Sequence, residues 1–208
     1  MTLLALEFSS DRRSVALARD GAVLAEAVQH TESRATNAFS LIENLLAETK
    51  IPREEIETIA VGLGPGSYTG IRSAIALAQG WQLAQGIKLL GVSSVEAMVW
   101  RAQVKNIFGR VSVMLDAQRG EFYLATWEIS ATDCREISPL KIVAAGEIEA
   151  RTAAAEIFIG PESAPQIFPG ATEIARLAQR KILLKDEVLE PIYLRATSFV
   201  KAPPSREL

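Results

Sequence analysis

Short apolar runs separated by polar turns open the chain. Residues 3–8 are dense enough in apolar side chains to form a buried strand, and polar residues 9–13 turn the chain back into a second run at 14–18. Asp20-Gly21 is a hairpin signal that leads into a third run, 22–28. The pattern therefore predicts three antiparallel strands.

A helical period follows these strands. Apolar positions at spacings of three and four predict a helix over residues 34–49, which begins near Ser33 and ends at Lys50-Ile51-Pro52. An apolar stripe of this kind commonly covers a protein core. A surface for a partner protein is the alternative interpretation.

The centre of the sequence is a glycine-rich loop between a predicted strand, residues 57–61, and a predicted helix, residues 68–85. Four glycines within residues 62–70 allow positive φ angles and the close approach of another surface. Ser67 or Thr69 can cap the helix, and a further strand is expected at 88–92. The apolar face of this helix contains Ile71, Ala74, Ile75 and Ala78.

Familiar loop motifs do not fit this segment. A P-loop requires a lysine that is missing here, and a dinucleotide fingerprint requires a different glycine spacing. A nucleophile elbow needs glycines two residues before and after its serine, where Ser67 has Pro65 and Thr69. The glycines alone therefore assign no ligand.

The opening pattern recurs in the second half. A helical segment is expected to begin around Ser93-Ser94 and to run through Val104. Residues 111–115 then end in Asp116, turn at Arg119-Gly120 and return at 122–127, much as the first strand ends in Glu7 before its own turn. We therefore predict two related α/β halves, residues 1–108 and 109–208. The second half is expected to continue with a strand at 139–143, a helix at 145–155, a strand at 156–159, a helix at 172–180 and a frayed tail.

Composition restricts the partners that we expect. The chain has 208 residues, 49% of them hydrophobic, and a formal charge of −3, so no overall basic field would attract RNA to this chain alone. Cys134 is the only cysteine, which fits a reducing cytoplasm. The first residues carry no basic leader, and no apolar run reaches the roughly 18 residues of a membrane span, so we expect a cytoplasmic protein with no membrane contact.

Three motifs carry a family resemblance. The segment from Gly64 to Arg72, GPGSYTGIR, resembles the GPGSFTGLR segment of the TsaB (YeaZ-type) family of tRNA threonylcarbamoyladenosine biosynthesis. DAQRGEFY, which begins at Asp116, is similar to DARRGEVY of that family, and PIYLR, which begins at Pro191, is similar to its PxYLR segment. The three segments lie in the family's order and span most of the chain.

The resemblance implies a fold and a role. The fold would be that of actin-like ATPases, with two ribonuclease-H-like halves, each a mixed sheet flanked by helices. The role would be that of a non-catalytic scaffold or activator that binds TsaD, the subunit that transfers the threonylcarbamoyl group to the adenosine next to the anticodon in tRNA. Further expected partners are the ATPase TsaE and, without TsaD, a second copy of the chain. Transfer RNA is expected to bind only through the complex.

The two apolar helix faces are the predicted partner interface. We expect the isolated chain to bind no cofactor, whereas ATP or ADP could bind at the interface with the partner. The predicted interface residues are Ala35, Ala38, Phe39, Ile42, Leu45, Leu46, Ile71, Ala74, Ile75 and Ala78.

Glu7 and Asp116 end equivalent strands, where actin-like ATPases place carboxylates that hold a metal ion's waters near the nucleotide phosphates. Glu7 is one methylene longer than the aspartate usual in the family and Phe8 replaces a threonine, which counts against a phosphate site at the first hairpin. TsaD binds its metal through an HxxxH pair, but His30 is the only histidine here, so we predict no metal site and no catalytic residue. The candidate phosphate contacts are Gly64, Gly66, Ser67, Arg72 and Asp116.

Two alternatives stay open. Asp116 and the glycine loop would suit a stand-alone nucleotide-dependent phosphotransferase of the same fold. The family's kinship with proteins once described as glycoproteases would suit a peptidase, although the shortage of histidines counts against it.

Overall fold

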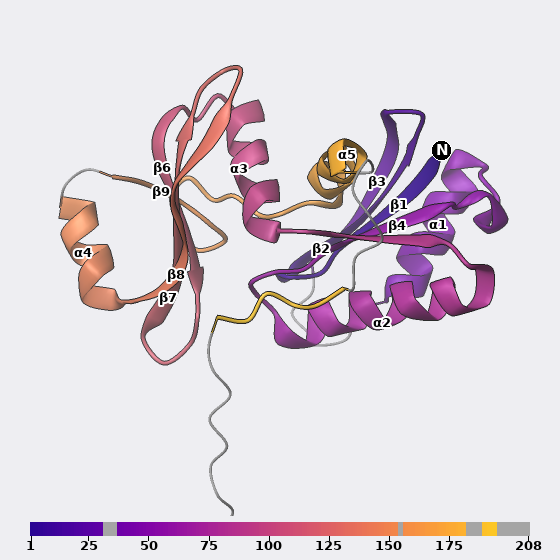
Figure 1. The fold of residues 1–208 in the computed structure, drawn as a ribbon, viewed down its shortest axis with the longest axis horizontal. Helices are drawn as coiled ribbons and strands as arrows, with labels where there is room; N and C mark the ends of the chain where they lie inside the picture. Colours follow the sequence, from indigo (N-terminus) through magenta and orange to yellow (C-terminus); the bar gives the residue numbers. More distant parts are fainter. Residues whose placement is uncertain (31–36, 154–155, 182–188, 195–208) are drawn as a thin grey trace, which may run out of the picture.

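The computed structural model describes residues 1–30, 37–153, 156–181 and 189–194, and it contains two mixed sheets flanked by helices (Figure 1). Ala35, the predicted helix start at Ser33 and the predicted frayed tail lie outside the described residues. The elements are β1 (Thr2–Glu7), β2 (Arg12–Arg19), β3 (Ala22–His30), α1 (Ala38–Thr49), a 3-10 turn (Arg53–Glu55), β4 (Thr58–Gly62), α2 (Tyr68–Gln85), β5 (Lys88–Val92), α3 (Ser94–Val104), β6 (Gly109–Asp116), β7 (Glu121–Ile129), β8 (Cys134–Ala144), α4 (Ala145–Ala153), β9 (Ile157–Ile159) and α5 (Ala171–Lys181).

The first sheet has the strand order β3-β2-β1-β4-β5. Strands β1 to β3 are antiparallel, β4 lies parallel to β1, and β5 lies parallel to β4. Because helices cover both faces, β1 and β4 are buried along their whole length and do not alternate between apolar and polar residues. The three antiparallel opening strands predicted from the sequence are confirmed.

The second sheet repeats this order over four strands, β8-β7-β6-β9. Strands β6 to β8 are antiparallel and β9 is parallel to β6, as β4 is to β1. The turn between β6 and β7 contains Arg119 and Gly120, which have φ angles of 62° and 74°. The predicted fold class of two related halves, each a mixed sheet with flanking helices, is confirmed.

Two helices cross between the halves. Helix α5 follows the second sheet in sequence but packs on the first sheet, on the face opposite α1 and α2, while α3 packs on the second sheet (Figure 1). Helices α3 and α5 touch each other, and Arg101 forms an ion pair with Glu173 at 2.8 Å between them. The division of the chain at residue 108 stays a proposal, because elements on both sides of it contribute to each packed layer.

The apolar faces of α1 and α2 form the core of the first half. Seven of the ten residues predicted to form the partner interface are at most 8% exposed and pack against the first sheet, so that assignment is wrong for them. A sheet with an apolar face must be covered, and these helices cover it. Phe39 is 70% exposed and Leu46 is half-buried. The seven buried residues are Ala38, Ile42, Leu45, Ile71, Ala74, Ile75 and Ala78.

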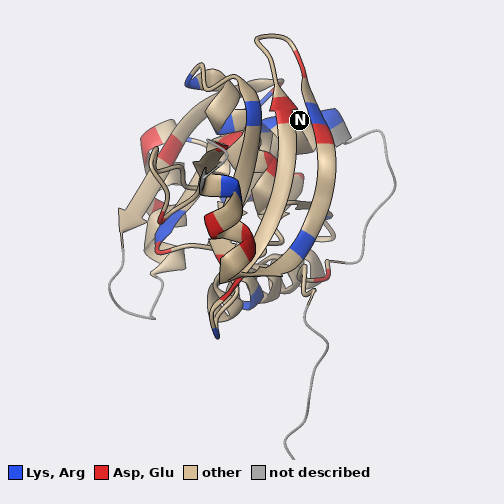
Figure 2. Cartoon of the chain, turned by 90° about the vertical axis from the view of Figure 1, so that its left-hand side faces the viewer, with Lys and Arg blue, Asp and Glu red and all other residues tan. Residues whose placement is uncertain are grey.

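The surface mixes both signs of charge. Figure 2 shows Lys and Arg positions interspersed with Asp and Glu positions along the ribbon, seen from the side of the second half. This distribution matches the small formal charge of −3. Within the described ranges, no helix is both long and apolar enough to cross a membrane.

Candidate functional site

The glycine loop packs against the turn between β1 and β2. A Cβ atom at Gly66 would lie 2.1 Å from the carbonyl oxygen of Ser9, and one at Gly70 would lie 2.0 Å from the carbonyl oxygen of Phe8. The backbone N–H of Ser67 donates to the Ser9 carbonyl at 2.7 Å. The surface that approaches this loop closely is therefore part of the same chain.

Hydrogen bonds join the loop to two other segments. The N–H of Ile192 donates to the carbonyl of Leu63 at 2.9 Å, so the described part of the PIYLR motif, residues 191–194, lies against the glycine loop. The N–H of Gly64 donates to Ser94 Oγ at 3.1 Å, which fixes the loop to the start of α3. Ser67 caps α2, as predicted, because its Oγ accepts from the N–H of Gly70 at 3.3 Å.

The DAQRGEFY motif, which begins at Asp116, faces the glycine loop across a cleft between the halves. The cleft has a volume of about 790 Å³ and is lined by Gly66, Ser67 and Tyr68 on one side and by Asp116 and Arg119 on the other. The fold thus brings together three of the five candidate phosphate contacts. Gly64 and Arg72 are not among the residues that line the cleft.

Glu7 does not face the cleft as a free carboxylate. Its side chain is fully buried, and its two oxygens accept from the N–H of Ser9 and from Ser94 Oγ, each at 2.7 Å. It lies directly on the backbone of Gly62, where a Cβ atom would be 2.0 Å from Glu7 Oε2. Burial raises the pKa of Glu7, which outweighs the effect of its hydrogen bonds. This carboxylate therefore holds the end of β1 to the start of α3.

Asp116 is exposed and supports its own turn. Its Oδ1 accepts from the backbone N–H of Gln118, and its Oδ2 accepts from Gln118 Nε2, both at 2.7 Å. Of the two strand-end acids it is the one that lines the cleft. Over the described ranges, no group of three or more His, Cys, Asp and Glu side chains is placed to hold a metal ion.

The sequence did not reveal an aromatic stack between two residues that line the cleft. The rings of Tyr68 and Tyr193 stack with centroids 5.5 Å apart, and the Arg72 guanidinium lies 4.4 Å from the Tyr68 centroid. Arg72 Nε also donates to the Tyr193 hydroxyl at 3.3 Å. The spacing of Tyr68 and Arg72, four residues apart at a helix start, was the available signal. Tyr193 comes from a distant segment that only the fold brings near.

One exposed stripe of α2 consists of small residues and one large apolar residue, Leu83. Leu83 is 89% exposed, and a Cβ atom at Gly80 would meet nothing within 4 Å. Thr69, Ser73 and Ala76 share this exposed face at helical spacing. It is the opposite side of the helix from the buried stripe.

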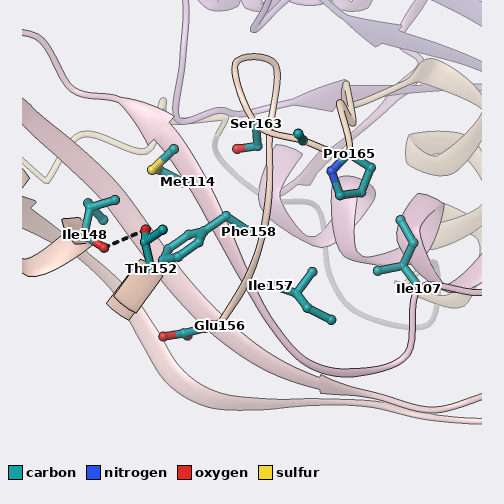
Figure 3. A pocket seen from close by; sticks show the side chains of 10 residues that line it. Ile107, Met114, Ile148, Thr152, Glu156, Ile157, Phe158, Ser163 and Pro165 are labelled. Atoms are coloured by element: carbon teal, nitrogen blue, oxygen red, sulfur yellow. Dashed lines mark hydrogen bonds between the residues drawn. The ribbon is translucent and has the colours of Figure 1, made fainter. Parts of the chain in front are cut away.

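A shallow apolar depression lies beside β9 in the second half. Figure 3 shows Met114, Ile148 and Phe158 gathered on one side of it and Ile107 on the other. Among the described residues that line it, Glu156 is the one charged side chain, and it is already bound by Ser112 Oγ and by Arg151 at 3.3 Å. The lining therefore offers no pair of free acid and base groups.

Comparison with known proteins supplies a family. A family model described as "TsaD: tRNA N6-adenosine threonylcarbamoyltransferase" matches residues 18–200. The chain is 33% identical to the tRNA threonylcarbamoyladenosine biosynthesis protein TsaB of Escherichia coli over 128 residues, which cover 62% of this chain and 55% of that protein. It is 27% identical to the protein of the same name from Haemophilus influenzae over 100% of this chain and 99% of the other. The match thus spans about half of the Escherichia coli relative and nearly all of the Haemophilus influenzae one.

Solved structures give the same result. A crystal structure from Pseudomonas aeruginosa, described as an uncharacterized protein with similarity to the peptidase YeaZ, is 26% identical to this chain. It superposes with a TM-score of 0.78 over 93% of this chain and 99% of the other.

Proposed function

The chain belongs to the TsaD family and is of its TsaB (YeaZ) type, and from this premise we propose that it is a non-catalytic subunit of tRNA threonylcarbamoyladenosine synthesis. It acts by binding a TsaD-type partner, which performs the transfer to tRNA. The names of the relatives support the pathway. The burial of the Glu7 side chain supports the non-catalytic role.

The single observation that carries the non-catalytic role is the burial of Glu7. An acid that positions a metal ion's waters beside a nucleotide must present its oxygens to the cleft. Here both oxygens are used by Ser9 and Ser94 inside the protein, and the carboxylate is 0% exposed. Only Asp116 of the pair is left at the cleft, so the two carboxylates do not converge on one ion.

The proposed docking surface is the outer face of α1 and α2. Phe39 and Leu83 are the two most exposed large apolar side chains of these helices, and such side chains gain most from burial against a partner. Small residues on α2, including Ala76 and Gly80, would let a partner helix approach closely. We therefore place the docking contacts on the side of each helix that faces away from the sheet.

Other parts of the assembly belong to the same proposal. A second copy of the chain would use this surface when no TsaD-type partner is present, as a two-fold dimer. ATP or ADP would bind at the interface with the partner, TsaE would join the complex, and tRNA would bind only to the complex. The isolated chain would bind no cofactor.

The test is association with the TsaD-type protein of the same genome. Light scattering of the mixture should show a one-to-one complex, and the complex should modify tRNA faster than the partner alone. Phe39→Asp and Leu83→Asp should each weaken association about 10- to 100-fold, because burying one such side chain contributes about 1.5–3 kcal/mol. Ile137→Asp, at a residue on β8 that is 42% exposed, is the matched control and should leave association unchanged.

Two results would contradict this proposal. One is failure of the unmodified chain to associate with the partner when ATP and magnesium are present. The other is an equal loss of binding in the Ile137→Asp control, because it would place the contacts elsewhere or show a general effect of added charge.

A nucleotide-dependent phosphotransferase is the second candidate. It is favoured by the presence of Ser67 and Asp116 on opposite walls of one cleft. Micromolar ATP binding by the isolated chain, lost in Asp116→Asn, would support this alternative over the scaffold. Calorimetry of the isolated chain with ATP and magnesium distinguishes the two.

A further inference from the structure

A second polar cavity lies where α3, α5 and the β7–β8 hairpin meet, apart from the cleft (Figure 1). Its volume is about 340 Å³, and its walls include Trp100 from α3, Trp127 and Asp133 from the hairpin, and Arg180 from α5. Gln103 Nε2 donates to the Ser130 carbonyl at 2.7 Å, which holds the hairpin against α3. The cavity is therefore bounded by elements that are fixed to each other.

The indole N–H of Trp127 has no hydrogen-bond acceptor. Its Nε1 atom is buried and unpaired among the described residues. By contrast, Trp81 on α2 donates its indole N–H to Gln85 at 2.8 Å. A buried donor without a partner destabilises the fold, and such groups are rare in native proteins. An acceptor on a bound molecule would satisfy it after a small shift of the neighbouring side chains, because the Nε1 atom itself is not exposed to the cavity.

Arg180 provides an unpaired positive charge at the same cavity. Its guanidinium lies 4.2 Å from the Trp100 ring centroid, and within the part of the chain that the structure describes it forms no ion pair. A guanidinium stacked on a ring keeps its N–H donors free at its edge, where they can bind a carboxylate with two parallel hydrogen bonds. Arg101 on α3, in contrast, is already paired with Glu173.

Asp133 provides an unpaired negative charge. Its backbone is fixed by Ser130, whose Oγ accepts from the Asp133 N–H at 3.0 Å, while its carboxylate has no ion-pair partner among the described residues. Both charges lie close to the Cys134 thiol: burial raises the pKa of Cys134, Asp133 raises it further, and Arg180 lowers it. The two charges border one cavity without neutralising each other.

We propose that this cavity binds a free α-amino acid with an apolar side chain. The carboxylate would accept from Arg180 and, once the side chains around it shift, from Trp127 Nε1, and the ammonium group would bind Asp133. The apolar side chain would lie against Leu177, which also lines the cavity and is partly exposed. The volume is at the lower end of the range for ligand pockets and suits a molecule of this size. A simple anion would leave the Asp133 carboxylate at the cavity without a partner.

Proton–nitrogen NMR of the full chain tests the site directly. The sequence has three tryptophans, so the spectrum contains three indole N–H peaks, and Trp127→Phe identifies the relevant one. L-leucine is the probe, and the Trp127 peak should shift saturably as it is added. L-leucinamide lacks the carboxylate and N-acetyl-L-leucine lacks the ammonium group. Each should bind about tenfold more weakly or worse, the effect of losing one charge-assisted hydrogen bond.

Substitutions of two exposed residues, Arg180 and Asp133, complete the test without disturbing the core. Arg180→Gln and Asp133→Asn should each weaken L-leucine binding about tenfold, whereas Trp81→Phe, on α2, should not change it. Absence of a Trp127 shift up to the solubility of L-leucine would overturn the proposal. Equal affinity for L-leucine and its two derivatives would do so as well, because it would show that neither charge is recognised.

Discussion

Glu7 and Gly62 depend on each other, which gives a sharp test of how the end of β1 is built. The Glu7 carboxylate lies on the Gly62 backbone, and a Cβ atom there would be 2.0 Å from Oε2 and 2.7 Å from Cδ. The side chain is fully buried between Ser9 and Ser94. Gly62→Ala must therefore displace the carboxylate from its hydrogen-bond partners.

The size of the effect follows from these two hydrogen bonds. Each bond to a charged group contributes about 1.5–3 kcal/mol, so losing both costs about 3–6 kcal/mol. A Gly-to-Ala change recovers about 1 kcal/mol at most by restricting the unfolded chain. We therefore expect Gly62→Ala to lower the free energy of unfolding by about 2–5 kcal/mol. Glu7→Asp, which is one methylene shorter, should also destabilise the protein, since it withdraws the carboxylate and leaves a gap.

The double variant separates this contact from other effects. In Glu7→Asp/Gly62→Ala the new methyl group occupies space that the shorter acid has left. The double variant should therefore lose at least about 1 kcal/mol less unfolding free energy than the sum of the losses in the two single variants. Urea unfolding of the four proteins measures this coupling. Gly146→Ala is the control, because a Cβ atom there would meet nothing within 4 Å. Strictly additive costs, or a Gly62→Ala protein as stable as the unmodified chain, would refute the described packing.

Two further predictions concern the buried acid and the buried helix stripe. Because burial raises the pKa of Glu7, the native state keeps this proton to higher pH than the unfolded chain does, so stability should fall as pH rises from about 4.5 through the native pKa. Glu7→Gln should not show that fall. Urea unfolding midpoints of both proteins, measured across this pH range, check the prediction. If the two midpoints change with pH in the same way, Glu7 is not the group responsible. Ala74→Phe should destabilise the monomer by about 1–3 kcal/mol or prevent folding, because Ala74 is fully buried, and circular dichroism with thermal unfolding measures this. A normally stable Ala74→Phe protein that fails only to bind the partner would restore Ala74 to the interface.

The elements were predictable because their signals are local. The helix expected at 68–85 and the strand expected at 88–92 have those bounds in the structure. Helical spacing of apolar residues and a serine cap at Ser67 sufficed for the helix. The repeated hairpin was likewise predictable, because in each half a strand ends with an acidic residue directly before a turn.

Two features depend on contacts that local patterns do not record. An apolar stripe such as Ile71, Ala74 and Ala78 looks the same whether a sheet or a partner protein covers it, and here the sheet covers it. Helix α5 follows the second sheet in the sequence but packs on the first sheet. Its position in the sequence does not predict this packing. The glycines of the loop correctly indicated a close approach, but the approaching group is Ser9 of the same chain.

Gly80 offers a last test, in which stability and docking should change in opposite directions. It lies inside α2 on the exposed face, and a methyl group there would meet nothing within 4 Å in the isolated chain. Gly80→Ala should therefore stabilise the monomer by about 0.5–1 kcal/mol, the difference in helix propensity. If a partner helix packs closely on this face, the same methyl group must be accommodated in the interface, which typically costs 1–3 kcal/mol, or about 5- to 100-fold in affinity. A more stable monomer that binds the TsaD-type partner with unchanged affinity would move the docking contacts away from this face of α2.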